Sequence, residues 1–362
     1  MKSTLRLLAG AFALVSCAGL FDGDQYGTGS WNKPRWIADA VRTIASGRYP
    51  QVKAISYWHE KWKNDDGLYS DLRLNSSNEA AQAYRDGTKS SMFVTQPEYS
   101  IAVDMWKFEP PASGVYLAAF PGFGATEDIV SGNTLADFES IAGHRVAWAY
   151  FSDNWYHGIQ FPSINVAKIH AAGRVPFIRM MMRSQENNPC PDPKYSLQQI
   201  IDGKYDKDLT KWAQEAKGTG LPMLVEFGTE VNGDWFSWNG KYNGGGDKNG
   251  FGDPNKADGP ERFVAAYRRI VDTFRREGAY NVSWAWHVDA ESSPSNSWNQ
   301  ISEYWPGADY VDWIGVSIYG PQKPTEPGGT SFEAILDRVY PQLTKLSTEK
   351  PIAILEWGIT EP

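Results

Sequence analysis

Short apolar runs rich in β-branched and aromatic residues recur along the chain, and longer helical patterns lie between them. This alternation is typical of parallel strands joined by crossover helices. Helical patterns are predicted at 206–217, 261–276 and 332–346. The body of the chain holds seven predicted strands, at residues 115–120, 145–151, 175–181, 221–227, 281–287, 311–319 and 352–356. Seven parallel strands do not close a (β/α)8 barrel, so an eighth strand has to come from elsewhere.

The front of the chain supplies this strand. Asn32 can cap a helix with Pro34 near its start, residues 52–58 have the pattern of a strand, and a second helix is expected around 78–85. A helix, a strand and a helix are what is missing after 352–356. We therefore predict a circularly permuted barrel in which strand 52–58 lies between strands 115–120 and 352–356. The alternative is a truncated barrel with an unrelated N-terminal extension.

The first residues have the three-part pattern of a secretory signal: Lys2 and Arg6, an apolar stretch at 7–15, and small residues at 16–18. We expect a signal peptide at 1–18, a spacer at 19–30 and one barrel domain at 31–362. Residues 14–17 resemble a bacterial lipobox, so Cys17 could carry a lipid, and ordinary cleavage after Ala18 is the alternative. The sequence thus predicts an exported protein, either secreted or a cell-surface lipoprotein. Cys190 then has no intramolecular partner for a disulfide.

The amino-acid composition limits the classes of binding partner that this chain can have. With 35 Lys+Arg against 43 Asp+Glu the net charge is −8, which argues against nucleic acid and anionic membranes. A membrane is expected only through the lipid, and the protein is expected to be a monomer. The chain contains 16 Trp, 18 Tyr and 16 Phe residues. This aromatic content favours a carbohydrate-binding cleft, because a flat apolar ring matches the C–H face of a sugar, although a Trp-heavy core is the other explanation. His59-Glu60 lacks the second His of a zinc protease, and we expect neither metal nor cofactor.

Two carboxylates stand where two of the predicted strands end. Glu230 follows strand 221–227, and Glu356 ends strand 352–356. The C-terminal ends of barrel strands converge on one mouth, so these side chains can meet although they are 126 positions apart. Two carboxylates at a Trp-rich mouth suit glycoside hydrolysis, in which one protonates the leaving oxygen and the other attacks the anomeric carbon or activates water. Glu226 points to the same side but deeper, where a structural pairing with Arg179 is expected.

The run from Glu230 to Trp238, Glu-x-Asn-Gly-x-Trp-Phe-x-Trp, resembles glycoside hydrolase family 26, the β-mannanase family of the retaining barrel glycosidases. Residues 310–319 and 351–358 look like the sixth and seventh strands of this family, and 114–124 like its first. The similarity covers roughly residues 110–360, and residues 31–93 look similar to the closing segment of the family. The resemblance therefore also supports the permutation.

The resemblance implies roles for individual residues. Glu230 would be the general acid/base, Glu356 the nucleophile, Tyr319 a hydrogen-bond donor to the nucleophile, and Trp235 a packing surface for the sugar at the cleaved bond. Trp58 matches the aromatic floor beneath that sugar. Further contacts with the substrate are expected from four residues: Asn232, Trp238, Trp286 and His287.

One position departs from the family. Thr229 stands where the family usually has a His immediately before the acid/base, and a hydroxyl cannot carry the charge of an imidazole. Substrate choice, pH optimum or membership of a sister family could follow from this difference.

The environments of the two carboxyls should differ. We expect apolar neighbours to raise the pKa of Glu230, and hydrogen bonding from Tyr319 to favour ionised Glu356. The sequence thus predicts a retaining endo-glycanase, with β-mannan favoured and mixed-linkage β-glucan, β-xylan or an exopolysaccharide as alternatives. A non-catalytic glycan-binding protein is the second class, and transglycosylation would use the same residues.

Overall fold

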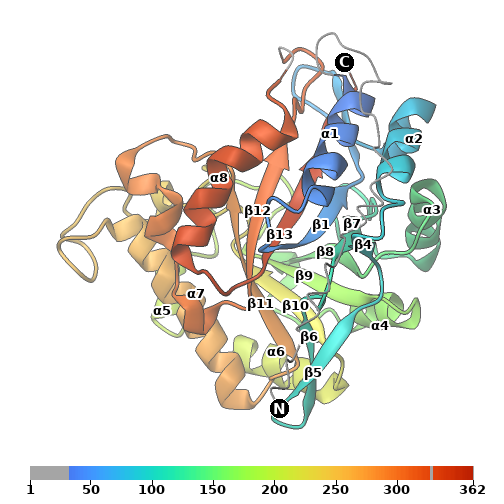
Figure 1. Ribbon diagram of the computed structural model, residues 1–362. Coiled ribbons are helices and arrows are strands. Elements are labelled where there is room, and N and C mark those ends of the chain that lie inside the picture. The colour runs from blue at the N-terminus through green and yellow to red at the C-terminus, as the bar shows by residue number, and fades with distance from the viewer. Residues whose placement is uncertain (1–31, 327–328, 362) are drawn as a thin grey trace, which may run out of the picture.

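The structure, a computed structural model, describes residues 32–326 and 329–361. Within them, parallel strands form a closed ring of eight, and the ring is closed by pairing of its first member with both neighbours (Figure 1). In order, the strands are β1 (Val52–Trp58), β7 (Val115–Phe120), β8 (Trp148–Asn154), β9 (Val175–Met181), β10 (Met223–Phe227), β11 (Val282–Asp289), β12 (Trp313–Tyr319) and β13 (Ile352–Gly358). The predicted (β/α)8 barrel is confirmed.

Helices surround the ring: α1 (Lys33–Ala45), α2 (Asn78–Gly87), α3 (Gly132–Ala142), α4 (Ser163–Ala171), α5 (Leu197–Ile201), α6 (Asp206–Thr219), α7 (Asp258–Glu277) and α8 (Phe332–Leu346). Each long helix buries one face. In α7, for example, Phe263, Tyr267, Ile270 and Phe274 are fully buried against the barrel, at the spacing of one helix face. Asn32 caps α1 as expected, because its side chain accepts a hydrogen bond from the backbone N–H of Arg35.

β1 lies where the sequence predicted. It pairs in parallel with β13 on one side and with β7 on the other, so the N-terminal helix and strand complete the barrel and an unrelated extension is wrong. That β1 corresponds to the last strand of the family, as a circular permutation requires, stays a prediction. The signal, lipobox and spacer predictions fall on residues 1–30, outside the described residues. Among the described helices, none has the length and apolar character needed to cross a bilayer.

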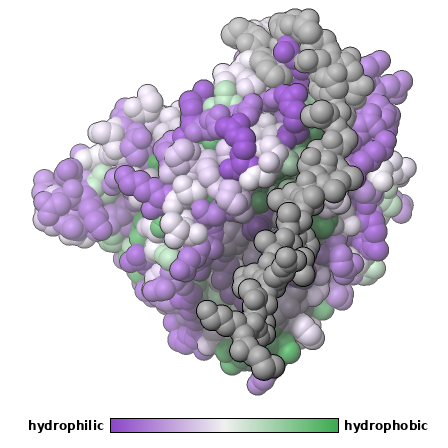
Figure 2. Space-filling view, viewed as in Figure 1, coloured by the Kyte–Doolittle hydropathy of each residue, from purple (hydrophilic) through white to green (hydrophobic). Residues whose placement is uncertain are grey.

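The lower end of the barrel is closed by a hairpin of β5 (Glu98–Ala102) and β6 (Met105–Glu109), shown beneath the strands in Figure 1. Phe108 is buried and stacks on Trp313, with ring centroids 5.7 Å apart. The Lys107 ammonium lies 2.7 Å from the Asp312 carboxylate. The hairpin exposes the apolar side chains of Ile101 and Val103, and Figure 2 shows hydrophobic surface at this end of the molecule.

A second hairpin, of β2 (Lys61–Lys63) and β3 (Tyr69–Asp71), directly follows the C-terminal end of β1. It therefore stands at the opposite end of the barrel, at the mouth, where it contributes Trp62. Neither hairpin was predicted, nor was the two-residue strand β4 (Phe93–Val94), which pairs with β7 outside the ring. Three- and five-residue strands give too short a periodic pattern to be recognised in a single sequence.

Candidate active site

Glu230 and Glu356 meet at the mouth. Glu356 lies on β13 and Glu230 in the loop after β10, and one oxygen of each carboxyl lies within 4.8 Å of the other. Their exposed fractions are 7% and 4%. Two buried carboxyls this close can act on one bond. The separation fits a site in which one carboxylate attacks directly (about 5–5.5 Å) and is too short for one that places a water between them (about 6.5–9.5 Å).

The backbone around Glu230 is unusual. Glu230 has φ +47°, a left-handed conformation that non-glycine residues rarely adopt. Three residues on, Gly233 leaves room for the Trp235 ring, because a Cβ there would lie 2.2 Å from the indole. The Trp235 indole N–H can then donate to Glu230 Oε2 at 2.7 Å. The motif from Glu230 to Trp238 thus folds as a tight loop that fixes the orientation of one carboxyl.

Two other residues of this motif hold the loop from below. The Asn232 amide accepts from the N–H and donates to the carbonyl oxygen of Asp289, at 2.7 and 2.9 Å. The buried indole of Trp238 donates to the Thr229 carbonyl oxygen at 2.7 Å. Both side chains are fully buried, so the motif is recognisable in the sequence partly for a structural reason.

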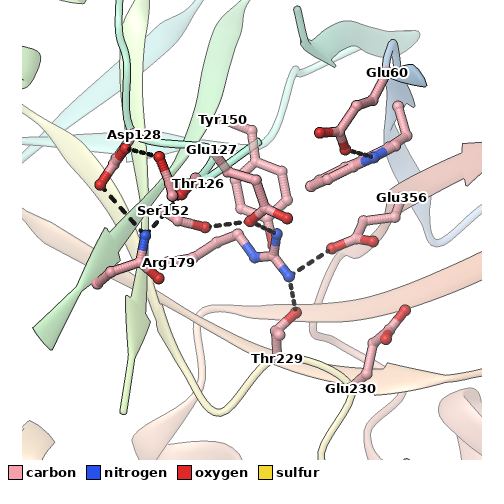
Figure 3. A network of polar contacts seen from close by, with 12 residues as sticks. Glu60, Thr126, Glu127, Asp128, Tyr150, Ser152, Arg179, Thr229, Glu230 and Glu356 are labelled. Atoms are coloured by element: carbon pink, nitrogen blue, oxygen red, sulfur yellow. Dashed lines mark hydrogen bonds and ion pairs between the residues drawn. The ribbon is translucent and has the colours of Figure 1, made fainter. Parts of the chain in front are cut away.

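Glu356 is held by Tyr319 and Arg179. The Tyr319 hydroxyl donates to Glu356 Oε2 at 2.9 Å. Arg179 Nη2 lies 3.3 Å from Glu356 Oε1, the contact drawn in Figure 3. The expected contact from Tyr319 is therefore present. Burial nevertheless raises the pKa of Glu356 to about 8, with Glu230 adding to the rise and Arg179 and His287 opposing it. Burial therefore shifts Glu356 towards its protonated form, although the hydrogen bond from Tyr319 by itself favours the ionised form.

Beneath this pair lies a buried polar network centred on His287. Its Nδ1 is 3.0 Å from Glu226 Oε2 and 2.8 Å from Thr229 Oγ1, and its Nε2 is 2.9 Å from Ser317 Oγ. Burial lowers the pKa of His287, but the carboxylates around it, chiefly that of Glu226, raise it by more. The net rise favours the imidazolium form of His287. Thr229 thus contacts an imidazole from another strand, so the site contains a histidine although none precedes Glu230 in the chain.

Arg179 also pairs with Glu226, as expected, with Nε 3.5 Å from Oε1. The two residues are neighbours in register on β9 and β10. Arg179 therefore connects the buried network to the nucleophile candidate Glu356.

Glu230, His287 and Glu356 each bring one donor atom within 4.8 Å of the others, the geometry of a three-ligand metal site. Both nitrogens of His287 are already engaged, by Glu226 and Thr229 on one side and Ser317 on the other. A metal would have to displace these contacts, so this set of residues does not fit a metal ion.

A cavity of about 760 Å³ lies over the carboxyl pair. Five of the predicted site residues line it: Trp58, Glu230, Trp235, Tyr319 and Glu356. Sequence reasoning missed other lining residues, among them Glu60, Trp62, Glu127, Arg179, Arg183 and Asp289. Glu127 lies in the loop after β7 and Trp62 on the hairpin after β1, positions near strand ends that could have indicated them, but the sequence leaves the directions of these side chains open.

The remaining predictions of substrate contact do not fit. Asn232, Trp238, Trp286 and His287 are fully buried and lie outside the lining of the cavity, so direct contact with a sugar is not open to them. Trp58 reaches the cavity but is only 4% exposed, because Phe120 stacks on it at 4.1 Å and the Arg179 guanidinium lies 5.1 Å from its ring. Trp235, at 41% exposure, is the more available aromatic surface.

Comparison with known proteins gives a consistent result. The family model described as "Glycosyl hydrolase family 26" matches residues 191–349. Endoglucanase H of Acetivibrio thermocellus is 25% identical over 280 residues, which cover 75% of this chain and 28% of that protein. A β-1,3-xylanase of an Alcaligenes species is 30% identical over 128 residues, covering 35% and 22%. A mannan endo-1,4-β-mannosidase of Bacillus subtilis is 26% identical over 151 residues, covering 40% and 33%. The chain thus matches between 22% and 33% of the length of these relatives.

Solved structures similar to this one include Bacillus subtilis mannanase BCman, at 20% identity and a TM-score of 0.45, with 63% of this chain and 67% of that chain covered. A GH26 β-mannanase from Bacteroides ovatus is 16% identical with a TM-score of 0.42, covering 90% and 77%.

Proposed function

We propose that the chain belongs to glycosyl hydrolase family 26, whose model matches residues 191–349, and that it is a retaining, endo-acting glycoside hydrolase that cleaves a β-linked polysaccharide. The observation that carries the proposal is the pair of buried carboxyls, Glu230 and Glu356, with oxygens within 4.8 Å at the mouth of the barrel. β-Mannan is the first substrate to test. The relatives include mannanases, an endoglucanase and β-1,3-xylanases, so β-glucan and β-xylan are the alternatives.

In the proposed mechanism, Glu356 attacks the anomeric carbon while Glu230 gives a proton to the leaving oxygen. The covalent glycosyl-enzyme is then hydrolysed by a water from which Glu230 takes a proton. Glu356 must be ionised for the first step, and Arg179 and His287 are the groups that favour this form. Trp235, whose indole N–H bonds to Glu230, would keep the acid directed at the leaving oxygen.

Endo action is supported by the form of the cleft. The cavity over the carboxyls shares Trp62, Trp235 and Tyr319 with a neighbouring cavity of about 780 Å³. It shares Glu60 and Ala125 with a third cavity, of about 380 Å³. A groove that continues on both sides of the carboxyl pair can accept the interior of a polymer.

The proposal is tested by reducing-sugar release from galactomannan, glucomannan, lichenan, xylans and laminarin, with the wild type and Glu356→Ala measured together. We expect release from one of these polymers by the wild type alone. Equal release by the variant would remove Glu356 as nucleophile. Binding of a polymer without release would support the second candidate, a glycan-binding protein.

Export is also part of the proposal. The charged start, the apolar stretch at 7–15 and the small residues at 16–18 support a secreted or lipid-anchored protein that acts outside the cell. Mass spectrometry of the mature N-terminus would distinguish a lipidated Cys17 from ordinary cleavage after Ala18.

A further inference from the structure

Four carboxyls that line the catalytic cavity have no part in the mechanism described above: Glu60, Asp65, Glu127 and Asp289. Glu60 follows the C-terminal end of β1, and Glu127 lies in the loop after β7. Figure 3 shows both facing the centre of the site, with Glu127 joined to Arg179 and Arg179 joined to Glu356. They therefore stand on the side of the nucleophile, across the site from the loop that carries Glu230.

The carboxyls of Glu60 and Glu127 are each fixed through one oxygen. Glu127 Oε2 accepts from Arg179 Nη1 at 2.7 Å and from the Ser152 hydroxyl. Glu60 Oε2 accepts from the Trp58 indole N–H at 2.9 Å. Within residues 32–326 and 329–361, neither Oε1 atom has a hydrogen-bond partner. Each carboxyl is thus held in place with an acceptor left over, and both line the cavity.

The backbone at Glu127 is left-handed, with φ +60°. The described residues contain five such non-glycine positions, and two of them, Val103 and Asp104, form the tip of the distant hairpin. The other three, Glu127, Asn188 and Glu230, all line the catalytic cavity. Unfavourable backbone conformations persist where the surrounding structure imposes them, and they concentrate at ligand sites. Glu127 shares this feature with the proposed acid/base.

Negative charge already crowds this part of the cavity. Burial, together with Glu127 and Glu356, raises the pKa of Glu60 to about 8. The nearest cation, Arg179, is paired with Glu127, Glu226 and Glu356. Arg183 also lines the cavity and forms no ion pair among the described residues; its guanidinium donates to the Glu186 carbonyl oxygen. A negatively charged group next to Glu60 and Glu127 therefore meets two carboxyls and an Arg179 that is already paired.

We propose that Glu60 and Glu127 form a carboxylate pair that accepts hydrogen bonds from hydroxyl groups of the glycan on the nucleophile side of the cleaved bond, and that this pair selects neutral sugars over acidic ones. Carboxylate oxygens accept strong hydrogen bonds from the hydroxyl groups of a sugar. The negative charge of the same carboxylates would repel a uronate, sulfate or phosphate substituent. The third cavity, which shares Glu60, continues the groove on this side. The inference rests on the proposed function and names its substrate class.

The test uses Glu60→Gln and Glu127→Gln, which keep the shape and the anchoring oxygen but cannot carry a negative charge. Because the pKa of Glu60 is raised to about 8, the variants are compared with the wild type at pH 8 or above, where Glu60 carries a charge that its variant lacks. Each is measured on a neutral polymer that the wild type cleaves and on its carboxymethylated form, with the exposed Glu349→Gln as the control. Both variants should lose about 10- to 100-fold in kcat/KM on the neutral polymer, the range for a lost charged hydrogen bond. They should also raise the ratio of carboxymethylated to neutral kcat/KM, which Glu349→Gln leaves unchanged.

An unchanged ratio, with both polymers losing equally, would mean that the two residues only support the fold and would overturn the proposal. So would an unchanged kcat/KM on the neutral polymer. Affinity electrophoresis on the same two polymers separates this test from the proposed function. If the wild type binds the neutral polymer without cleaving it, hydrolysis fails as the function, and weaker retention of the two variants still supports the pair. If neither polymer retains the wild type, both the proposed function and the role of the Glu60–Glu127 pair are overturned.

Discussion

The two ends of the barrel are built differently. At the lower end, the β5–β6 hairpin closes the ring with an apolar contact, Phe108 on Trp313, and with one ion pair at the margin. At the mouth, six carboxyls line a single cavity: Glu60, Asp65, Glu127, Glu230, Asp289 and Glu356. Three of the cavity residues have left-handed backbones. The first arrangement stabilises the fold, while the second places charges and strain where a folded protein gains no stability from them. Substitutions at the lower end should therefore reduce stability and leave kcat nearly unchanged, whereas substitutions at the mouth should reduce kcat without reducing stability.

The largest effect is expected from Glu356→Gln at the mouth. Removing the nucleophile should lower kcat by about 10⁴- to 10⁶-fold, the range for loss of one member of a catalytic unit. The folded fraction, followed by circular dichroism, should not fall, because glutamine has the same shape. A variant that retains a tenth of the wild-type kcat would show that Glu356 is not the nucleophile.

Glu230→Gln should have the next largest effect, a loss of about 10²- to 10⁴-fold with natural substrates, as for removal of a general acid/base. An aryl glycoside whose leaving group needs no proton should lose much less in the first step. The matched comparison is therefore polymer against aryl glycoside in the same variant. Equal losses on both substrates would argue that Glu230 is not the acid.

At the lower end, Phe108→Ala should cost about 3–5 kcal/mol of stability, because the ring is fully buried between the hairpin and the strands. The value of kcat for the folded protein should stay within about twofold, since the mouth is at the other end. Trp106→Ala on the same hairpin is the control, because its ring is 54% exposed and should contribute far less. Denaturant unfolding measures both. A large loss of kcat in Phe108→Ala would show that the two ends are not independent.

The smallest effect concerns pH. Burial raises the pKa of Glu356 to about 8 from the ordinary carboxyl value of 4.5, so the native state keeps a proton that the unfolded state releases between these values. The contribution of Glu356 to stability is fully present below pH 4.5 and declines as the pH rises to about 8. Glu356→Gln lacks this decline, so its midpoint of thermal unfolding should rise relative to the wild type across this window. A constant difference would mean that Glu356 is ionised throughout.

Helices and strands with a regular spacing of apolar residues could be predicted from the sequence. The bounds of β1, β7, β9 and α8 agree with the expected ranges, since each has a regular apolar pattern with clear ends. The strand expected at 145–151 instead runs Trp148–Asn154, because the apolar run begins before the chain enters the sheet. The sequence predicted Glu230 and Glu356 because both end strands of one barrel.

What could not be predicted depends on side-chain direction across several loops. Trp238 and Trp286 look like sugar platforms in the sequence but are fully buried, since a barrel with this many tryptophans also uses them as core. Glu127 follows a strand end, but the direction of its side chain could not be predicted, because it depends on a left-handed backbone and on Arg179 from another strand. The partnership of Thr229 with His287 joins residues 58 positions apart and could not be inferred from either alone.

The anomeric form of the first product tests the central claim most directly. The wild type would be mixed with the β-glycan that it cleaves, and the new reducing end observed by ¹H NMR before mutarotation. With carboxyl oxygens within 4.8 Å, we predict that the β anomer appears first and that the α anomer grows in only by mutarotation. Initial release of the α anomer would contradict direct attack by Glu356 and, with it, the proposed mechanism.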